Sequence, residues 1–187
     1  MSWSECLGRE PDESVERLLD TLSACHQEAA RSNSNASSAA IRHVAACGGS
    51  FDTAVASALL TLGFKHAPIA AARRLIYDET EEWVVERLEG GEKIPGWGNS
   101  FFKKGIDPAF APIDLYLRSY HPAGASDRLD RISEAIFKVT GKTLFPNAAA
   151  YSAVCAEIVN LPRGTESSLF ISCRLPVWAE QYAEAQP

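Results

Sequence analysis

The sequence lacks the features that mark several large classes of protein. No apolar run reaches the roughly 20 residues that a membrane-spanning helix needs. The first residues contain neither a basic segment nor an apolar core, so we expect no secretory signal and a cytoplasmic protein. Acidic residues outnumber basic ones, 24 against 18, and the net charge is −6. Without a basic stripe, nothing in the sequence predicts a nucleic-acid partner.

Motifs of metal and nucleophile chemistry are missing as well. The five cysteines are odd in number and follow no repeating spacing, which argues against a disulfide framework. There is no CxxC, HExxH, GxSxG, Walker or GxGxxG motif. His43 and Cys47 are four residues apart and make half a metal site at most. A surface histidine beside a small buried thiol is the simpler interpretation, so we expect no metal site.

Helical periodicity is what the sequence does contain. No stretch alternates between polar and apolar residues over five or more positions, so the predicted fold class is all-α. Two polar or Gly- and Pro-rich loops, over 32–38 and 94–112, interrupt the pattern, and 181–187 is expected to fray. With 187 residues, 46% of them apolar, and no evident linker, the chain suits a single unit. Helices are predicted over 11–31, 39–46, 51–62, 68–88, 113–118, 126–140, 148–160 and 165–183.

Four segments point further than this periodicity. In order along roughly residues 32 to 182, they resemble the C-terminal part of the citrate synthase family. None is distinctive alone, but the four in register make a specific match. The segments are SNASS at 34–38, LLTLGFKHAP at 59–68, IPGWGN at 94–99 followed by Asp107-Pro108, and LFPNAAAYS at 144–152 followed by LFISCR at 169–174 and Trp178.

The resemblance implies a citrate-synthase-like helical fold with a small lobe and part of the large lobe. We expect residues 1–187 to form one unit, with approximately 66–155 resembling the small lobe and 1–65 and 156–187 the large lobe. Members of the family are usually dimers. They enolise an acyl-CoA and condense it with a 2-oxo acid, or cleave citryl-CoA. This chemistry needs a carboxylate base, a neutral imidazole that stabilises the enolate, and a second imidazole that holds the oxo acid together with arginines.

Three polar side chains fall at positions that the resemblance assigns to the site, and two of them keep the family's residue. His66 matches the enolate-stabilising histidine, Arg174 matches a substrate-binding arginine, and Asn99 stands where the family has its second histidine. The other interpretations are a histidine bonded to backbone at a helix junction, an arginine paired with a carboxylate such as Glu180, and a turn asparagine. The implied CoA contacts are Pro95, Gly96, Trp97, Gly98 and Lys103, with Lys104 as an alternative to Lys103 and a solvated lysine pair as the simpler interpretation.

At three other positions this sequence lacks the residue that the family has. Ala149 stands at the place of the catalytic aspartate, Ala109 at that of an arginine that grips a substrate carboxylate, and Ser32 at that of another substrate-binding histidine. A methyl group does no acid–base work, and losing one essential proton-transfer group costs on the order of 10²–10⁴ in rate.

Three hypotheses follow for function. In the first, the protein has a degenerate site and is a non-catalytic or weakly active acyl-CoA-binding subunit, with CoA or acetyl-CoA as ligand and no covalently bound cofactor. It would form a homodimer or a hetero-oligomer with a citrate synthase-family chain. In the second, it is an active condensing acyltransferase or citryl-CoA lyase that uses His66, Asn99 and Arg174 with another base, such as Asp107 or a residue of a partner chain. In the third, it is an interaction module that binds no CoA.

Overall fold

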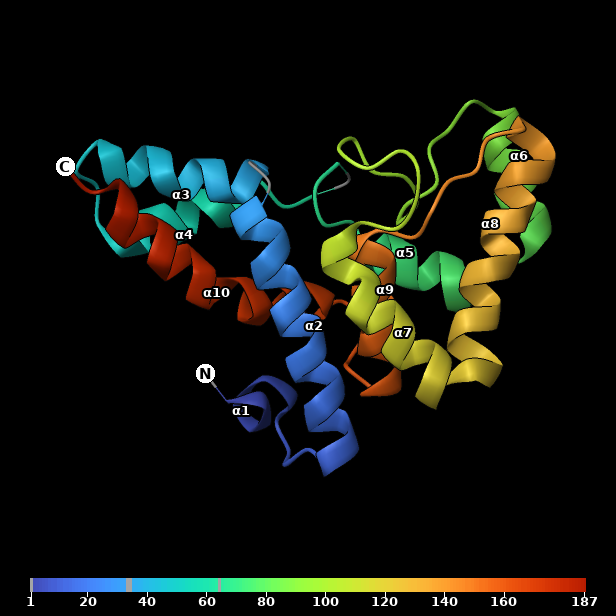
Figure 1. The fold of residues 1–187 in the computed structure, drawn as a ribbon, viewed down its shortest axis with the longest axis horizontal. Helices are drawn as coiled ribbons and strands as arrows, with labels where there is room; N and C mark the ends of the chain where they lie inside the picture. Colours follow the sequence, from blue (N-terminus) through green and yellow to red (C-terminus); the bar gives the residue numbers. More distant parts are fainter. Residues whose placement is uncertain (1, 33–34, 64) are drawn as a thin grey trace.

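Ten α-helices and two short helical turns make up the part of the chain that the computed structural model describes (Figure 1). That part is the whole chain except residues 1, 33–34 and 64 and the side chains of Ser32, Pro122 and Ala123. Within it, extended pairing is limited to two isolated bridges, so the all-α prediction is confirmed. The helices are α1 (Trp3–Leu7), α2 (Glu13–Ser32), α3 (Ala36–Ala46), α4 (Phe51–Leu60), α5 (Ile69–Tyr77), α6 (Glu81–Glu89), α7 (Ala111–Tyr120), α8 (Asp127–Thr140), α9 (Ala148–Ile158) and α10 (Glu166–Ala185).

Side-chain caps begin several of these helices. The Ser50 hydroxyl accepts a hydrogen bond from the Thr53 amide and starts α4, as the sequence predicts. Asn35 and Asn147 cap α3 and α9 in the same way. Ser126, expected to cap α8, makes no such bond, because the preceding turn (Pro122–Ser126) leads into the helix with helical backbone angles. The two asparagine caps therefore fix the starts of α3 and α9, which both lie at the site described below.

The structure corrects several of the predicted helices and adds one that was not predicted. The single helix expected over 68–88 is two helices, because the apolar stripe of α5 meets polar residues at 79 and 80, and Thr80 is extended. The short helix α1 lies outside any prediction, and α3 begins at Ala36 instead of 39. The end of α10 stays helical to Ala185 where fraying was expected, since the Gln181 side chain is buried and donates to the Ala30 carbonyl.

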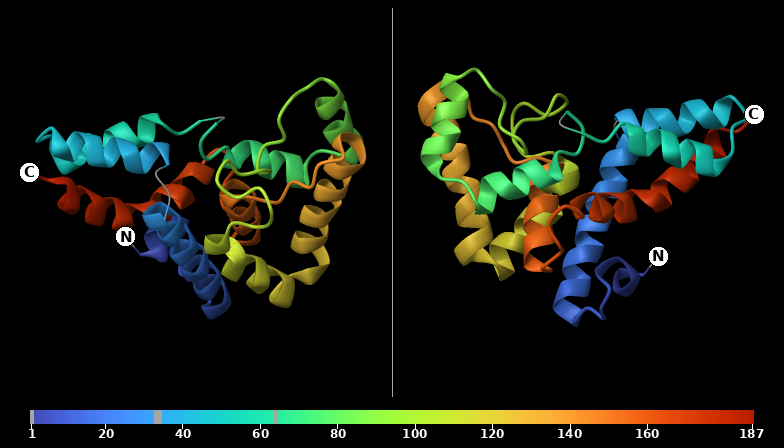
Figure 2. Two further views of the ribbon diagram at one scale, coloured as in Figure 1. Left: turned by 45° about the horizontal axis from the view of Figure 1, so that its top comes forward. Right: turned by 180° about the vertical axis from the view of Figure 1, so that it is seen from behind.

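The helices pack in two groups joined by α2. On one side α3 and α4 form an antiparallel pair against α10, and on the other α5 packs on α9 and α6 on α8 (Figure 1). Helix α2 runs between them and contacts α7, α9 and α10. The two views of Figure 2 show the long loop between α6 and α7 lying over the region where the groups meet. The lobe boundaries near residues 66 and 155 remain a prediction.

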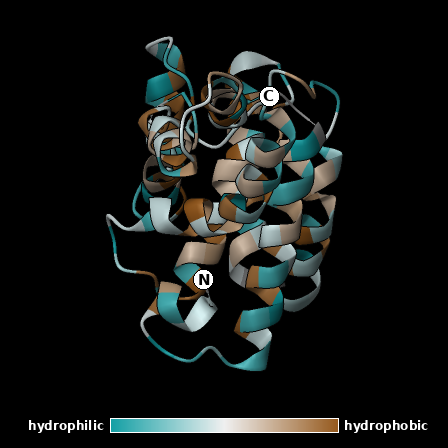
Figure 3. Cartoon of the chain, turned by 90° about the vertical axis from the view of Figure 1, so that its left-hand side faces the viewer, coloured by the Kyte–Doolittle hydropathy of each residue, from teal (hydrophilic) through white to brown (hydrophobic). Residues whose placement is uncertain are grey.

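The core runs through both groups. Residues 149–156 of α9 are all buried, as are Leu18, Leu19 and Leu22 of α2. Figure 3 shows hydrophobic residues between the helices and hydrophilic ones on their outer faces. No described helix is long and apolar enough to cross a membrane.

Candidate functional site

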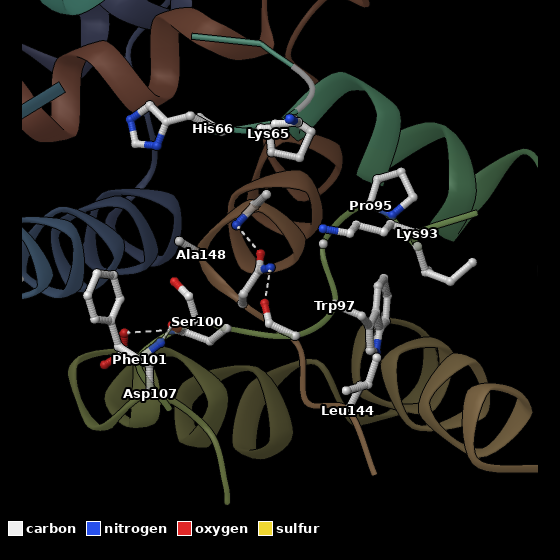
Figure 4. A pocket seen from close by; sticks show the side chains of 18 of the residues that line it. Lys65, His66, Lys93, Pro95, Trp97, Ser100, Phe101, Asp107, Leu144 and Ala148 are labelled. Carbon is white, nitrogen blue, oxygen red and sulfur yellow. Dashed lines mark hydrogen bonds between the residues drawn. The ribbon is translucent and has the colours of Figure 1, made fainter. Parts of the chain in front are cut away.

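A cavity of about 750 Å³ lies where the two helix groups and the 94–101 loop meet. The 65–68 turn before α5 forms one wall, and the first residues of α9 and the α10 residues Phe170 and Arg174 form others. In Figure 4, His66 and Lys65 lie on one side of this cavity, and Ser100, Phe101 and Asp107 lie on the opposite side. The cavity therefore gathers residues from four of the segments that carried the family resemblance.

The 94–99 loop is fixed by backbone pairing with the segment before α9. The Gly98 amide donates to the Phe145 carbonyl at 2.9 Å, and the Asn147 amide donates to the Gly96 carbonyl at 2.8 Å. The Asn147 side chain adds a 2.7 Å bond to the Gly98 carbonyl while its oxygen caps α9 through the Ala149 amide. One asparagine thus ties the loop to the N-terminus of α9.

Gly96 is required by both backbone angle and space. Its φ is +88°, and a Cβ there would lie 3.1 Å from the Cβ atoms of both Ala72 and Ala150. The next residue, Trp97, is buried and donates from its indole nitrogen to the Ser133 hydroxyl at 2.9 Å. The loop is therefore a docked part of the fold and shapes one wall of the cavity.

Asn99 and Asp107 close the remainder of the loop on itself. The Asn99 amide group donates to the Asp107 carboxylate at 3.2 Å, and its oxygen accepts from the Phe101 amide at 2.8 Å. The other Asp107 oxygen accepts from the Ala109 amide at 3.0 Å. Asp107 is buried and lines the cavity. Both polar atoms of the Asn99 side chain are therefore bonded within the loop.

His66 sits in a tight turn before α5. Gly63 and His66 exchange both of their backbone hydrogen bonds, and Ala67 has a left-handed φ of +57°. The His66 Nε2 atom lies 3.1 Å from the Ser37 hydroxyl, which donates its own proton to the Asn35 side chain. Nε2 must therefore carry the proton of a neutral ring and donate it to Ser37. In this arrangement the one N–H of neutral His66 is already engaged.

Arg174 reaches the cavity from the buried face of α10. Its guanidinium lies 5.2 Å from the centre of the Phe170 ring and its Nε donates to His26 Nδ1 at 3.3 Å. No carboxylate of the described residues lies within 4.0 Å of it; Glu180, offered above as its partner, pairs with Arg31. The buried Nη1 atom has no hydrogen-bond partner among the described residues. A buried cation of this kind is costly unless it serves a ligand.

His26 is a buried partner of Arg174 that the sequence did not predict, although it does not line the cavity itself. It is fully buried on α2, and its Nε2 lies 2.8 Å from the Ser152 hydroxyl, which donates to the Ala148 carbonyl. Nε2 is therefore protonated, and Nδ1 is free to accept from Arg174. Its one signal in the sequence is its place four residues after Leu22, on the buried face of the helix.

Burial sets the protonation of this cluster. It lowers the pKa of His26 well below 6.5, and the Arg174 guanidinium and His66 lower it further. Burial also lowers the pKa of His66, again with a contribution from Arg174. The pKa of Arg174 falls to about 10 through burial, opposed by Cys173 and Asp107, so this side chain stays charged at neutral pH. Both histidines are neutral beside one cation.

The predicted site residues fall into two sets. His66, Asn99, Arg174 and the loop residues Pro95, Gly96, Trp97 and Gly98 line one cavity, together with Ala149. Lys103 and Lys104 are exposed and do not line it, whereas Lys65, Lys93 and Lys142 do. Ala109 faces a different hollow beside α2, and the side chain of Ser32 lies outside the described part. Among the described residues, no three His, Cys, Asp or Glu side chains are placed to hold a metal ion. His43 is exposed as expected, but Cys47 is exposed too, so the prediction of a buried thiol was wrong: Cys47 follows the last residue of α3, where its side chain is not covered.

Comparison with known proteins agrees with this arrangement. Residues 2–186 match the family described as citrate synthase, C-terminal domain. The citryl-CoA lyase of Hydrogenobacter thermophilus is 24% identical with a TM-score of 0.81, over 98% of this chain and 73% of that one. Citrate synthase of Thermotoga maritima MSB8 is 23% identical with a TM-score of 0.75, over 94% of this chain and 50% of that one. At such identities, these two structures establish the shared fold alone.

Proposed function

The chain belongs to the citrate synthase family, and from this we propose that it is a catalytically degenerate member that binds CoA or an acyl-CoA. The observation that carries the proposal is Ala149. It lines the cavity, and the sequence resemblance assigns its position to the family's catalytic base, while the loop beside it is held by the Asn147 side chain. A binding pocket is retained, but a methyl group replaces the carboxylate that would abstract a proton from a thioester.

Two further residues support weak or absent catalysis. The His66 N–H donates a hydrogen bond to Ser37. His66 would have to break that bond before it could stabilise an enolate oxygen. The Asn99 side chain is hydrogen-bonded to the Asp107 carboxylate and to the backbone amide of Phe101. A side-chain amide also does not transfer protons at neutral pH. Each group that matches a catalytic position is thus engaged in holding the structure.

The mouth of the cavity supports a phosphate-bearing ligand such as CoA. Lys65, Lys93 and Lys142 are exposed at the cavity, and none makes an ion pair with another described residue. The acidic side chains near Arg74, Arg87 and Arg163, by contrast, are paired with those arginines. Ammonium groups that remain free are suited to bind phosphate groups as point charges.

The α3–α4 pair supports an oligomer, as members of this family are typically dimers. Leu59 and Leu60 of α4 are exposed, Leu60 to 87%, although this helix is apolar on most of its faces. A helix that is apolar all round is usually covered. We propose that a second copy, or another citrate synthase-family chain, covers it.

Calorimetric titration with acetyl-CoA and with free CoA tests the proposed ligand. We expect saturable binding, weakened by Lys93→Glu and unchanged in Lys138→Glu, an exposed lysine of α8 that does not line the cavity. Absence of heat with either ligand at millimolar concentration would overturn the CoA role and favour an interaction module. A steady-state assay with acetyl-CoA and oxaloacetate is the companion measurement, in which we expect no robust turnover.

Asp107 supports the alternative of an active condensing enzyme or citryl-CoA lyase. It is the buried carboxylate that lines the cavity, and a carboxylate is the group that the chemistry requires as base. Turnover that is robust in the wild-type protein and lost in Asp107→Asn would establish this alternative over the degenerate one.

A further inference from the structure

The lysine side chains on the cavity lining come from two different places. Lys93 and Lys142 lie shortly after the last residues of α6 and α8, which pack on each other, and Figure 1 shows these two helix ends side by side. Lys65 comes instead from the turn before α5, next to His66 (Figure 4). Two free ammonium groups at the ends of α6 and α8 suit the phosphate groups of a CoA molecule, which leaves Lys65 for another part of that ligand.

The turn that carries Lys65 lies between the exposed mouth of the cavity and its buried inner wall. Lys65 itself is exposed, whereas the half-buried ring of His66 packs perpendicular to Phe170, with 5.7 Å between the ring centres. On that inner wall, Phe170 and Ala149 are only 3% and 4% exposed. The two backbone hydrogen bonds between Gly63 and His66 fix the turn. Lys65 is therefore the lining lysine whose neighbour in the chain reaches the inner wall.

The inner wall suits the uncharged end of an acyl-CoA. Phe110, Phe170 and Ala149 supply apolar surface. Arg174 keeps a free N–H there, which can bond the carbonyl oxygen of a thioester. The asparagine, histidine and aspartate side chains that line the same cavity are already hydrogen-bonded within the protein, namely Asn35 to Ser37 and Ser38, His66 to Ser37, Asn99 and Asp107 to each other, and Asn147 to Gly98 and Ala149. An acyl-CoA thus fits with its acyl group inward and its phosphates toward the ends of α6 and α8.

A thioester bound in this way would keep its reactivity. The methyl group of Ala149 cannot enolise it, so its carbonyl carbon remains an electrophile. A lysine amine is a nucleophile that converts a thioester into a more stable amide. No described carboxylate is paired with Lys65, and its exposure lets water accept the proton that an ammonium group must lose before it can attack. A bound thioester therefore lies in a cavity whose border carries an unpaired amine.

We propose that Lys65 is a self-acylation site, at which the protein transfers the acyl group of a bound acyl-CoA to its own side chain. The free amine of Lys65 attacks the carbonyl carbon of the thioester. A C–N bond forms and the C–S bond breaks. The departing thiolate takes the proton that the nitrogen loses, so the products are an amide and CoA thiol. The inference rests on the proposed function, because an acyl-CoA must first bind in this cavity.

Peptide mapping by mass spectrometry, after incubation of the full chain with acetyl-CoA, gives the acetylated fraction of every lysine in one sample. Lys138 is the internal control, because it is exposed on α8 and does not line the cavity. We expect the initial rate at Lys65 to exceed the rate at Lys138 at least about tenfold, because binding raises the local concentration of the thioester. Lys93 and Lys142 should react more slowly than Lys65, since they face the phosphates.

Two further measurements separate binding from the intrinsic reactivity of the amine. The acetyl thioester of N-acetylcysteamine has the same reactive group without the nucleotide and phosphates. It should acetylate Lys65 and Lys138 at rates within about threefold of each other. Excess free CoA should suppress the preference for Lys65 seen with acetyl-CoA. Lys93→Glu should lower the rate at Lys65, because it weakens CoA binding, whereas Lys138→Glu should leave that rate unchanged.

Three results would overturn the inference: equal rates at Lys65 and Lys138 with acetyl-CoA, faster reaction at Lys93 or Lys142, or a preference for Lys65 that persists with the truncated thioester. The calorimetric titration with CoA shows which proposal has failed. Saturable CoA binding without preferred acetylation of Lys65 would reject self-acylation and keep the proposed function. Absence of CoA binding would reject the proposed function and this inference with it.

Discussion

The two ends of the cavity use their polar groups in opposite ways. At the loop end, Asn99, Asp107 and Asn147 satisfy one another and the nearby backbone. At the inner end, Arg174 is buried with an unpartnered nitrogen beside neutral His26 and His66. Satisfied groups hold a loop in shape, whereas a buried cation with an unpartnered nitrogen lowers stability. The comparison separates an end of the cavity whose polar groups are paired from one that keeps an unpaired charge.

Ala149→Asp is the change with the largest expected effect, because it would add a carboxylate that can act as a base at the loop end of the cavity. Following deuterium exchange into the methyl group of acetyl-CoA measures proton abstraction without any acceptor acid. We expect the exchange rate to rise by about 10²–10⁴ over the wild-type protein. Ala149→Asn, which has nearly the same shape but no carboxylate, is the matched control and should give no gain. An unchanged rate in Ala149→Asp would mean that the native site already works through another base.

Gly96→Ala should show how firmly the loop end is docked. The new Cβ would meet Ala72 and Ala150 at 3.1 Å in a left-handed conformation, so we expect a loss of about 2–4 kcal/mol in the free energy of unfolding. Gly98→Ala has a similar φ of +82° but its nearest contact is Leu144 at 3.9 Å, so it should lose only about 1–2 kcal/mol. Urea denaturation measures both, and equal losses would contradict the close docking of Gly96.

Acid should destabilise the inner end first. The folded-state pKa of His26 lies below its unfolded value of 6.5, so below that pH the unfolded chain binds more protons. Stability is then fully present above about pH 6.5 and falls as the pH drops, by up to about 1.4 kcal/mol per pH unit for this one group. Urea denaturation from pH 7.5 to 5.5 measures the slope. His26→Gln should flatten it and His43→Gln, an exposed histidine of α3, should not; the same slope in all three proteins would refute the assignment.

Asn99→Ala has the smallest expected effect. It removes two hydrogen bonds at a half-buried side chain, so the free energy of unfolding should fall by about 1 kcal/mol. If Asn99 only shapes the loop, the affinity for CoA in the same titration should change less than about threefold. A loss of more than about tenfold with unchanged stability would instead place Asn99 in contact with the ligand. Ser100→Ala, its exposed neighbour on the same loop, is the control.

Local sequence patterns predicted most of the helices because each follows from neighbouring residues. The stripe of Val15, Leu18 and Leu22 defines α2, and Ser50 caps α4. The prediction of one helix over 68–88 was wrong because Trp83 and Val84 continue the apolar pattern beyond the polar residues 78–80. In the structure they belong to a second helix, which packs on α8. Apolar periodicity predicts which residues are buried, but it does not predict which helix packs against them.

For the candidate site, the order of motifs in the sequence was enough to identify the family and to name His66, Arg174 and the substitution at Ala149. Only the tertiary structure placed His26 against Arg174, since 148 residues separate them. It also showed the partners of Asn99 and His66, because Asp107 and Ser37 come from other parts of the sequence. Residue type fixes what a side chain is able to donate or accept, and packing decides which of those bonds are already made.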